Sequence, residues 1–157
     1  MSPRSAVHAT FVIEKHYPAT PERVFAAFAD PKLKARWFVG PSEWGPSEHR
    51  VDFRVGGREL NAGGPAEGPK HRFDALYQDI VPNERIVFTY DMHLDANRIS
   101  VSLTTIEFAP ADGGTALKFT EQGVFLDGYD DAGSREHGTR LLLDQLGAAL
   151  AHGDAAH

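Results

Sequence analysis

Residues 85–94, RIVFTYDMHL, have the clearest strand pattern in the sequence. Apolar side chains recur at every second position, at Ile86, Phe88, Tyr90 and Met92. A period of two is typical of a β-strand that buries one side and exposes the other. The sequence therefore predicts a sheet with one apolar face, and that face needs another element to cover it.

Six further segments have strand-like composition, and residues that favour turns separate them. Gly56-Gly57 and Gly113-Gly114 permit positive φ, and Pro82-Asn83 starts a connection that is too short for a helix. Consecutive strands are therefore expected to pair antiparallel. The other predicted strands are residues 9–17, 44–54, 58–61, 72–80, 99–108 and 115–124.

Two short helices are expected between the first and the second strand. Thr20 is suited to cap the first helix, and Pro21 suits its first position. Pro31 ends this helix, because proline disfavours helical geometry in the residue before it. The second short helix is predicted over residues 32–38.

The cover for the sheet is predicted near the C-terminus. Leu142, Leu146, Ala149 and Leu150 recur at helical spacing within residues 131–151, the one segment long enough for this role. The pattern indicates a single α+β domain over residues 9–151 and a flexible C-terminal tail over residues 152–157.

Composition narrows the classes of function. A formal charge of -6 disfavours nucleic acid or an anionic membrane as the main partner. The chain has no cysteine, which excludes a disulfide framework and a thiol nucleophile. The histidines are scattered without metal-ligand spacing, so no metal and no cofactor are expected. We also expect a cytoplasmic location, because the sequence begins without the apolar run of a signal peptide.

Short motifs along the chain are similar, in order and spacing, to those of a known family. They are Pro21, Val24-Phe25, Asp30-Pro31, Trp37-Phe38, Phe53-Arg54-Val55-Gly56-Gly57, Glu84-Arg85-Ile86 and Gly114-Thr115. With the order of elements, they resemble the activator of heat-shock protein 90 ATPase homologue-like family of the START-like, Bet v I-like (SRPBCC) superfamily. The resemblance covers about residues 11–150. It implies a helix-grip fold: a seven-stranded curved antiparallel sheet with two short helices and a long C-terminal helix around a cavity.

The resemblance implies less about function, because related families include lipid carriers, hormone receptors and polyketide cyclases. Family members usually carry a glycine-tryptophan pair early in the final helix, whereas here Gly138 is followed by Thr139. The missing indole predicts an enlarged or reshaped cavity. A homodimer is compatible with the resemblance, since family members often pair through sheet or helix surfaces.

A small hydrophobic or amphipathic molecule is the expected ligand of this cavity. Its walls are predicted from inward-facing apolar residues of the strands and the final helix, and aromatic residues after the second short helix are expected at the mouth. Arg54 is a candidate for binding a carboxylate group of the ligand. The predicted ligand-binding residues are Trp37, Phe38, Arg54, Tyr77, Phe88, Tyr90, Met92, Leu103, Phe119, Glu121 and Leu142.

Glu121 continues the alternation of Leu117 and Phe119, so its carboxyl group is predicted to point inward. A carboxyl group in an apolar cavity has a raised pKa and can act as a general acid or base, with Tyr90 as a second candidate. Three functions remain open: a binding module, a cyclase-, dehydratase- or isomerase-like enzyme, and a protein-interaction or stress-response module with an incidental cavity. The last of these predicts a well-filled core and an exposed apolar surface patch.

Overall fold

A computed structural model describes residues 4–155 of the chain. Seven antiparallel strands form one sheet in the order β1-β7-β6-β5-β4-β3-β2. The strands are β1 (Ala6–Tyr17), β2 (Glu48–Val51), β3 (Arg58–Gly63), β4 (His71–Val81), β5 (Arg85–Leu94), β6 (Asn97–Ala111) and β7 (Gly114–Leu126). The helices are α1 (Pro21–Ala29), α2 (Pro31–Lys34), the 3₁₀ helix η1 (Ser42–Trp44) and α3 (Ala132–Ala155). The predicted helix-grip architecture is confirmed.

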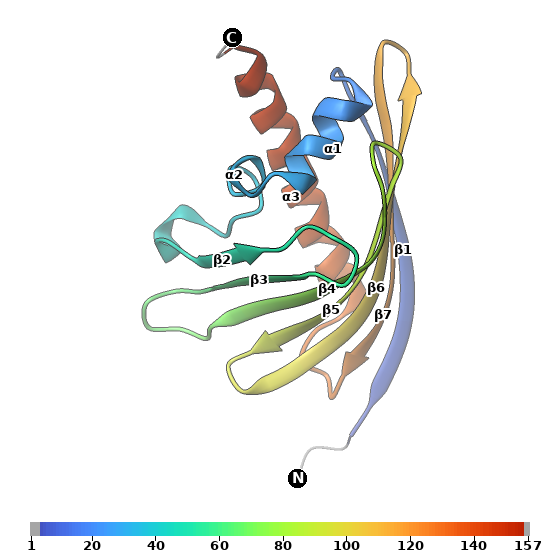
Figure 1. The fold of residues 1–157 in the computed structure, drawn as a ribbon. Helices are drawn as coiled ribbons and strands as arrows, with labels where there is room; N and C mark the ends of the chain where they lie inside the picture. The colour runs from blue at the N-terminus through green and yellow to red at the C-terminus, as the bar shows by residue number, and fades with distance from the viewer. Residues whose placement is uncertain (1–3, 156–157) are drawn as a thin grey trace.

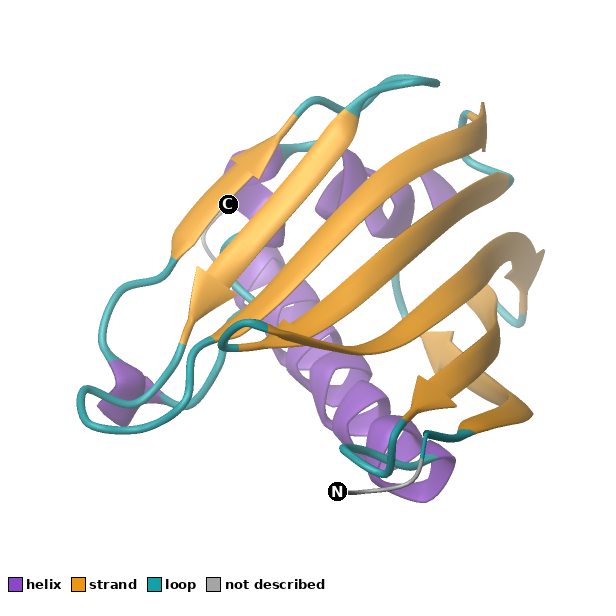
Figure 2. Cartoon of the chain, turned by 90° about the horizontal axis from the view of Figure 1, so that it is seen from below, coloured by secondary structure: helices purple, strands orange, loops and turns teal. Residues whose placement is uncertain are grey.

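The sheet is strongly curved, and α3 runs along its concave side (Figures 1 and 2). The deepest part of the core lies between them, where side chains from four strands meet α3. These fully buried residues are Ile13, Ile86, Ile106, Leu117, Leu143 and Leu146. Ile86 and Leu117 lie on the apolar face that the period-two pattern predicted.

Helix α1 begins where the sequence indicated, because Thr20 Oγ1 accepts a hydrogen bond from the backbone N–H of Arg23. The helix closes one end of the core with aromatic side chains. Phe25 and Phe28 each pack edge-to-face on Phe108 of β6, with ring centroids 5.6 Å apart. This end of the space between sheet and helix is therefore filled.

Two boundaries differ from the prediction in the segment after α1. The helix expected over residues 32–38 ends at Lys34, and the chain then turns so that Trp37 Nε1 donates a hydrogen bond to the Ala27 carbonyl. The strand expected over residues 44–54 is reduced to β2, because Gly45 has a φ of 71° and Pro46 follows it.

The C-terminal helix is longer than the pattern of apolar residues indicated. It continues to Ala155 and so includes most of the predicted tail, whose last two residues lie outside the described part of the chain. Within the described residues, no helix combines the length and the apolar character needed to cross a membrane.

Candidate functional site

A cavity of about 520 Å³ lies between the concave face of the sheet and α3. Aromatic and aliphatic side chains form most of its wall, including Trp37, Phe38, Phe73, Phe88, Met92, Ile99, Ile106, Phe119, Leu142 and Leu143. Polar side chains enter it at Lys34, Asn61, His71, Tyr90, Glu121, Asp130, Arg135 and Thr139. The volume falls within the range of ordinary small-molecule sites.

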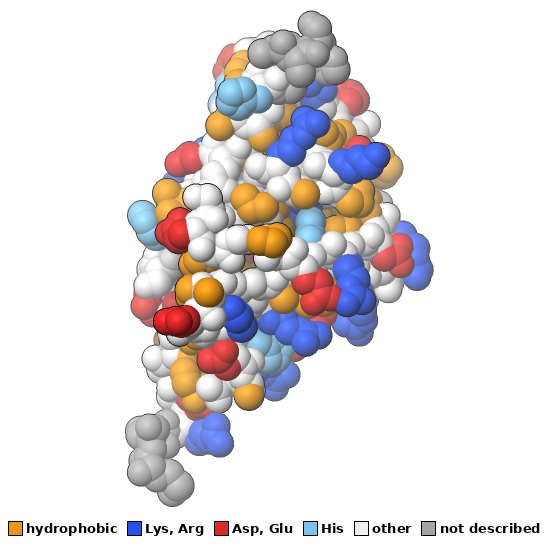
Figure 3. All heavy atoms as spheres, turned by 90° about the vertical axis from the view of Figure 1, so that its left-hand side faces the viewer, with side chains coloured by type: hydrophobic (Ala, Val, Ile, Leu, Met, Phe, Trp, Pro, Cys, Tyr) orange, Lys and Arg blue, Asp and Glu red, His pale blue; other side chains and the backbone are white. Residues whose placement is uncertain are grey.

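Several residues of the cavity wall are exposed to solvent, in the segment that follows α2 and around the beginning of α3. They include Val39, Gly40, Tyr129 and Gly138. The side of the molecule that carries the segment after α2 is shown in Figure 3, where hydrophobic side chains lie among acidic and basic ones. A small molecule could enter from this side without opening the sheet.

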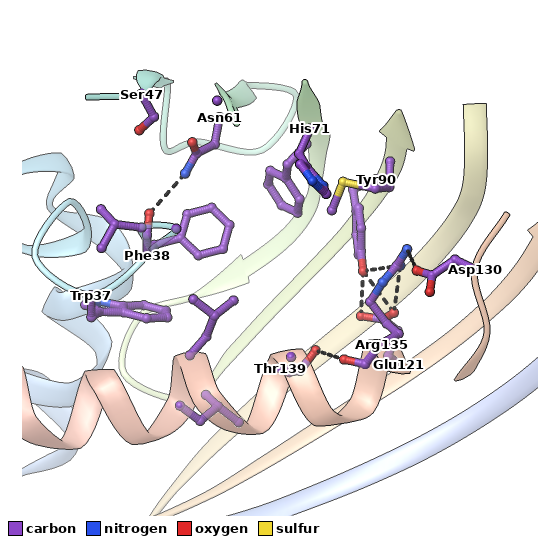
Figure 4. Close-up of a pocket in the computed structure, with 18 of the residues that line it drawn as sticks. Trp37, Phe38, Ser47, Asn61, His71, Tyr90, Glu121, Asp130, Arg135 and Thr139 are labelled. Carbon is purple, nitrogen blue, oxygen red and sulfur yellow. Dashed lines mark hydrogen bonds and ion pairs between the residues drawn. The ribbon is translucent and has the colours of Figure 1, made fainter. Parts of the chain in front are cut away.

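One end of the cavity carries a buried cluster built from three elements (Figure 4). Tyr90 of β5 donates to Glu121 of β7, with its hydroxyl oxygen 2.9 Å from each carboxylate oxygen. Arg135 of α3 donates from Nη1 to the Tyr90 hydroxyl at 2.8 Å, and the same nitrogen lies 3.5 Å from Glu121 Oε2. The phenol, the carboxyl group and the guanidinium are thus in mutual contact.

Hydroxyl groups on β6 complete the surroundings of Glu121. Ser102 Oγ lies 3.3 Å and Thr104 Oγ1 lies 3.4 Å from its carboxylate oxygens. Arg135 Nη2 donates to Ser100 Oγ at 2.8 Å and to Asp130 Oδ2 at 3.0 Å. The cluster therefore contains two carboxyl groups, one guanidinium and several hydroxyls. Each hydroxyl can donate or accept a hydrogen bond.

Burial governs the ionisation of this cluster. It raises the pKa of Glu121 above the usual value, although the charge of Arg135 and the hydrogen bonds from Tyr90, Ser102 and Thr104 act in the opposite direction. Burial, with the nearby charge of Glu121, also raises the pKa of Tyr90. Tyr90 is therefore neutral near pH 7, and Glu121 is the member of the cluster that is suited to bind or release a proton.

A second buried cluster, which the sequence did not indicate, includes Lys34 of the cavity wall. Glu59 of β3 accepts hydrogen bonds from Lys34 Nζ at 2.6 Å, from His49 Nε2 at 2.9 Å and from the Tyr77 hydroxyl. Burial opposes ionisation of Glu59, but Lys34 and these hydrogen bonds lower its pKa to about 2. Glu59 is thus a carboxylate that joins α2, β2, β3 and β4.

An aromatic pair also lies on the cavity wall. The His71 ring stacks on Trp44, with centroids 4.8 Å apart and planes inclined by 19°. Figure 4 shows His71 on the wall of the cavity. Burial lowers the pKa of His71, although Asp130 and Asp95 oppose this change. The imidazole is therefore neutral near pH 7 and adds a polar, uncharged group to the wall.

Most of the residues that the sequence singled out line the cavity. These are Trp37, Phe38, Phe88, Tyr90, Met92, Phe119, Glu121 and Leu142, for which ligand binding remains a prediction. Glu121 points inward as its alternation with Leu117 and Phe119 predicted, and it is only 2% exposed.

Three predicted residues lie elsewhere. Leu103 is 38% exposed, because the alternation of β6 turns Ser102 and Thr104 inward and Leu103 outward. The Arg54 side chain is 67% exposed and pairs with Asp52 at 2.9 Å. Tyr77 is buried beside Glu59 and is absent from the cavity wall. These three residues therefore do not line the cavity, which corrects their prediction as residues of its wall.

Comparisons with known proteins agree with this architecture. An uncharacterised protein from Rhizobium leguminosarum is 48% identical, with a TM-score of 0.91 over 96% of this chain and 99% of the other. A protein from Rhizobium loti is 50% identical, with a TM-score of 0.86 over 92% of this chain and 99% of the other. No curated protein matches the sequence. Residues 18–151 match the family described as activator of Hsp90 ATPase homolog 1-like protein, and the chain belongs to that family.

Proposed function

We propose that the protein binds a small, mostly apolar molecule in the cavity and holds a polar group of that molecule at the Tyr90–Glu121–Arg135 end. The observation that carries this proposal is a cavity of about 520 Å³ with an apolar wall and one polar end. An apolar wall stabilises a ligand by removing its surface from water, and a few fixed polar groups set its orientation.

The volume of the cavity also distinguishes ligand binding from the alternative of a protein-interaction module. A protein-interaction module with an incidental cavity predicts a well-filled core, and the described residues leave a cavity several times larger than a single side-chain void. Buried polar groups cost free energy unless they are paired. The cluster around Glu121 is paired internally and leaves the space beside it open, so ligand binding explains its position better than packing does.

Binding of a neutral apolar probe tests this proposal. A neutral naphthylamine dye is expected to bind the protein with 1:1 stoichiometry and to gain fluorescence, because the cavity wall excludes water from it. Native mass spectrometry of the freshly purified protein is expected to show either a bound small molecule or an apoprotein to which the dye then binds. A clean apoprotein that binds neither the dye nor other uncharged aromatic probes would contradict the proposal.

Acid–base chemistry on the bound molecule is a second candidate function, and the surroundings of Glu121 favour it. Its carboxyl group is buried, contacts the cavity and has a raised pKa. These properties suit a group that moves a proton to or from a carbon next to a carbonyl group. The neighbouring Tyr90 hydroxyl could donate to the carbonyl oxygen in such a reaction.

Hydrogen exchange tests this second candidate. An apolar ketone held in the cavity is expected to exchange its α-hydrogens with deuterated water faster by about 100-fold or more than in buffer, in the range of general acid–base catalysis. Proton NMR measures this rate, and Glu121→Gln is expected to return it to the buffer value. An unchanged rate in a ketone that demonstrably binds would leave binding as the function.

A further inference from the structure

We propose, on the basis of the binding function above, that the cavity takes its ligand as an oxyanion such as a carboxylate or a phenolate. The anion pairs with Arg135, and Glu121 takes up one proton as the anion enters.

Arg135 supplies a permanent positive charge inside the cavity. A guanidinium does not lose its proton in proteins, and this side chain is buried on α3. Three hydrogen bonds hold it, to the Tyr90 hydroxyl, Ser100 Oγ and Asp130 Oδ2. A guanidinium has more N–H groups than these three bonds use, so it keeps donor capacity for a ligand oxygen.

Two carboxyl groups already share this cation. Asp130 Oδ2 lies 3.0 Å from Arg135 Nη2, and Glu121 Oε2 lies 3.5 Å from Nη1. With both acids ionised, this end of the cavity carries one more negative charge than positive charge. An incoming oxyanion would add a second uncompensated negative charge, which is costly in a buried site. Uptake of one proton keeps the net charge unchanged.

Glu121 is the acid placed to accept that proton. It is fully buried, whereas Asp130 is partly exposed to water. Its oxygens contact the hydroxyls of Tyr90, Ser102 and Thr104, each of which can donate or accept by rotating. A protonated Glu121 can therefore donate to a hydroxyl, and no buried polar atom loses its partner.

Two other titratable side chains on the cavity wall are neutral near pH 7. The pKa of Tyr90 is raised and that of His71 is lowered, so both are neutral. Lys34 lies at the α2 end, 2.6 Å from the ionised Glu59, and is already paired. We therefore assign the incoming proton to Glu121.

Calorimetric titration with naphthoate and with methyl naphthyl ketone, which have the same ring system, tests the proposal. Naphthoate is ionised well above its carboxyl pKa, so it is an anion from about pH 6 to about pH 9. We expect naphthoate to bind with uptake of about one proton, measured from the heat in two buffers of different ionisation enthalpy. Its affinity is expected to fall by up to about tenfold per pH unit as the pH rises above the pKa of Glu121 in the free protein. The affinity of the ketone is expected to stay constant.

Two variants of the chain provide the controls. Glu121→Gln is expected to bind naphthoate with no proton uptake and no pH dependence, whereas Glu136→Gln, on the outer side of α3, is expected to behave as the wild type. Naphthoate binding to the wild type without proton uptake would overturn the proposal, and so would binding of the ketone alone. Failure of both probes to bind would instead count against the binding function itself.

Discussion

Glu59→Ala is expected to lower the free energy of unfolding by about 3–5 kcal/mol, the typical cost of removing one partner from a buried ion pair. The side chains of Lys34 and Glu59 are 5% and 1% exposed, so the substitution leaves an uncompensated positive charge away from water. It also removes the acceptor for Tyr77 and His49. Urea denaturation followed by circular dichroism measures the change.

A surface ion pair of similar length provides the comparison. Arg85 Nε lies 2.6 Å from Asp79 Oδ2, and both side chains are more than two-fifths exposed. Asp79→Asn is therefore expected to cost less than about 1 kcal/mol. Replacing both members of the buried pair, by Lys34→Met and Glu59→Leu, is expected to recover much of the loss. A cost below about 1 kcal/mol for Glu59→Ala would show that the pair contributes little to the fold.

Acid unfolding provides a second measurement of the same interaction. The pKa of Glu59 is about 2 in the folded protein, below the ordinary value of 4.5. The stabilisation that ionised Glu59 contributes to the folded state is therefore present above about pH 4.5 and is lost as the pH falls towards 2. This lowering of the pKa corresponds to about 3 kcal/mol of the free energy of unfolding at most. The free energy of unfolding of Glu59→Gln is expected to fall less steeply over this range than that of the wild type.

The parts of the fold that the sequence predicted correctly are those where apolar side chains recur with a single period along the chain. β5 begins and ends where its alternation indicated, and the inward direction of Glu121 follows from Leu117 and Phe119 on the same strand. The prediction for Leu103 was wrong because β6 carries the opposite arrangement: polar Ser102 and Thr104 face the core. They can do so because Glu121 on the neighbouring strand accepts their hydrogen bonds.

The sequence could not reveal partners that are distant along the chain. Arg135 precedes Leu142 by two helical turns, which was the available sign that it faces the core, but its contact with Tyr90 depends on how α3 crosses the sheet. Lys34 and Glu59 are polar residues in a short helix and a short strand, where exposure is the usual expectation. Only the folded chain brings them together.

Thr139→Trp is expected to weaken binding of the neutral naphthylamine dye by about 100-fold or more, which corresponds to about 2.7 kcal/mol. Thr139 lies on the cavity wall, on the face of α3 that also carries Arg135 and Leu142. An indole at this position would occupy space that the dye needs. The substitution removes the hydrogen bond from Thr139 Oγ1 to the Arg135 carbonyl, which costs little because such bonds add to the helix ladder and do not replace it.

The fold is expected to tolerate this substitution, because filling a cavity with apolar atoms is neutral or stabilising by about 1 kcal/mol. Ala148→Trp, on the exposed side of the same helix, is the matched control and is expected to leave dye binding unchanged.

Thermal unfolding followed by circular dichroism separates loss of binding from loss of structure. Thr139→Leu offers a smaller change if the tryptophan proves too large. A folded Thr139→Trp protein that binds the dye as tightly as the wild type would place binding outside the cavity, because an indole and the dye compete for the same space.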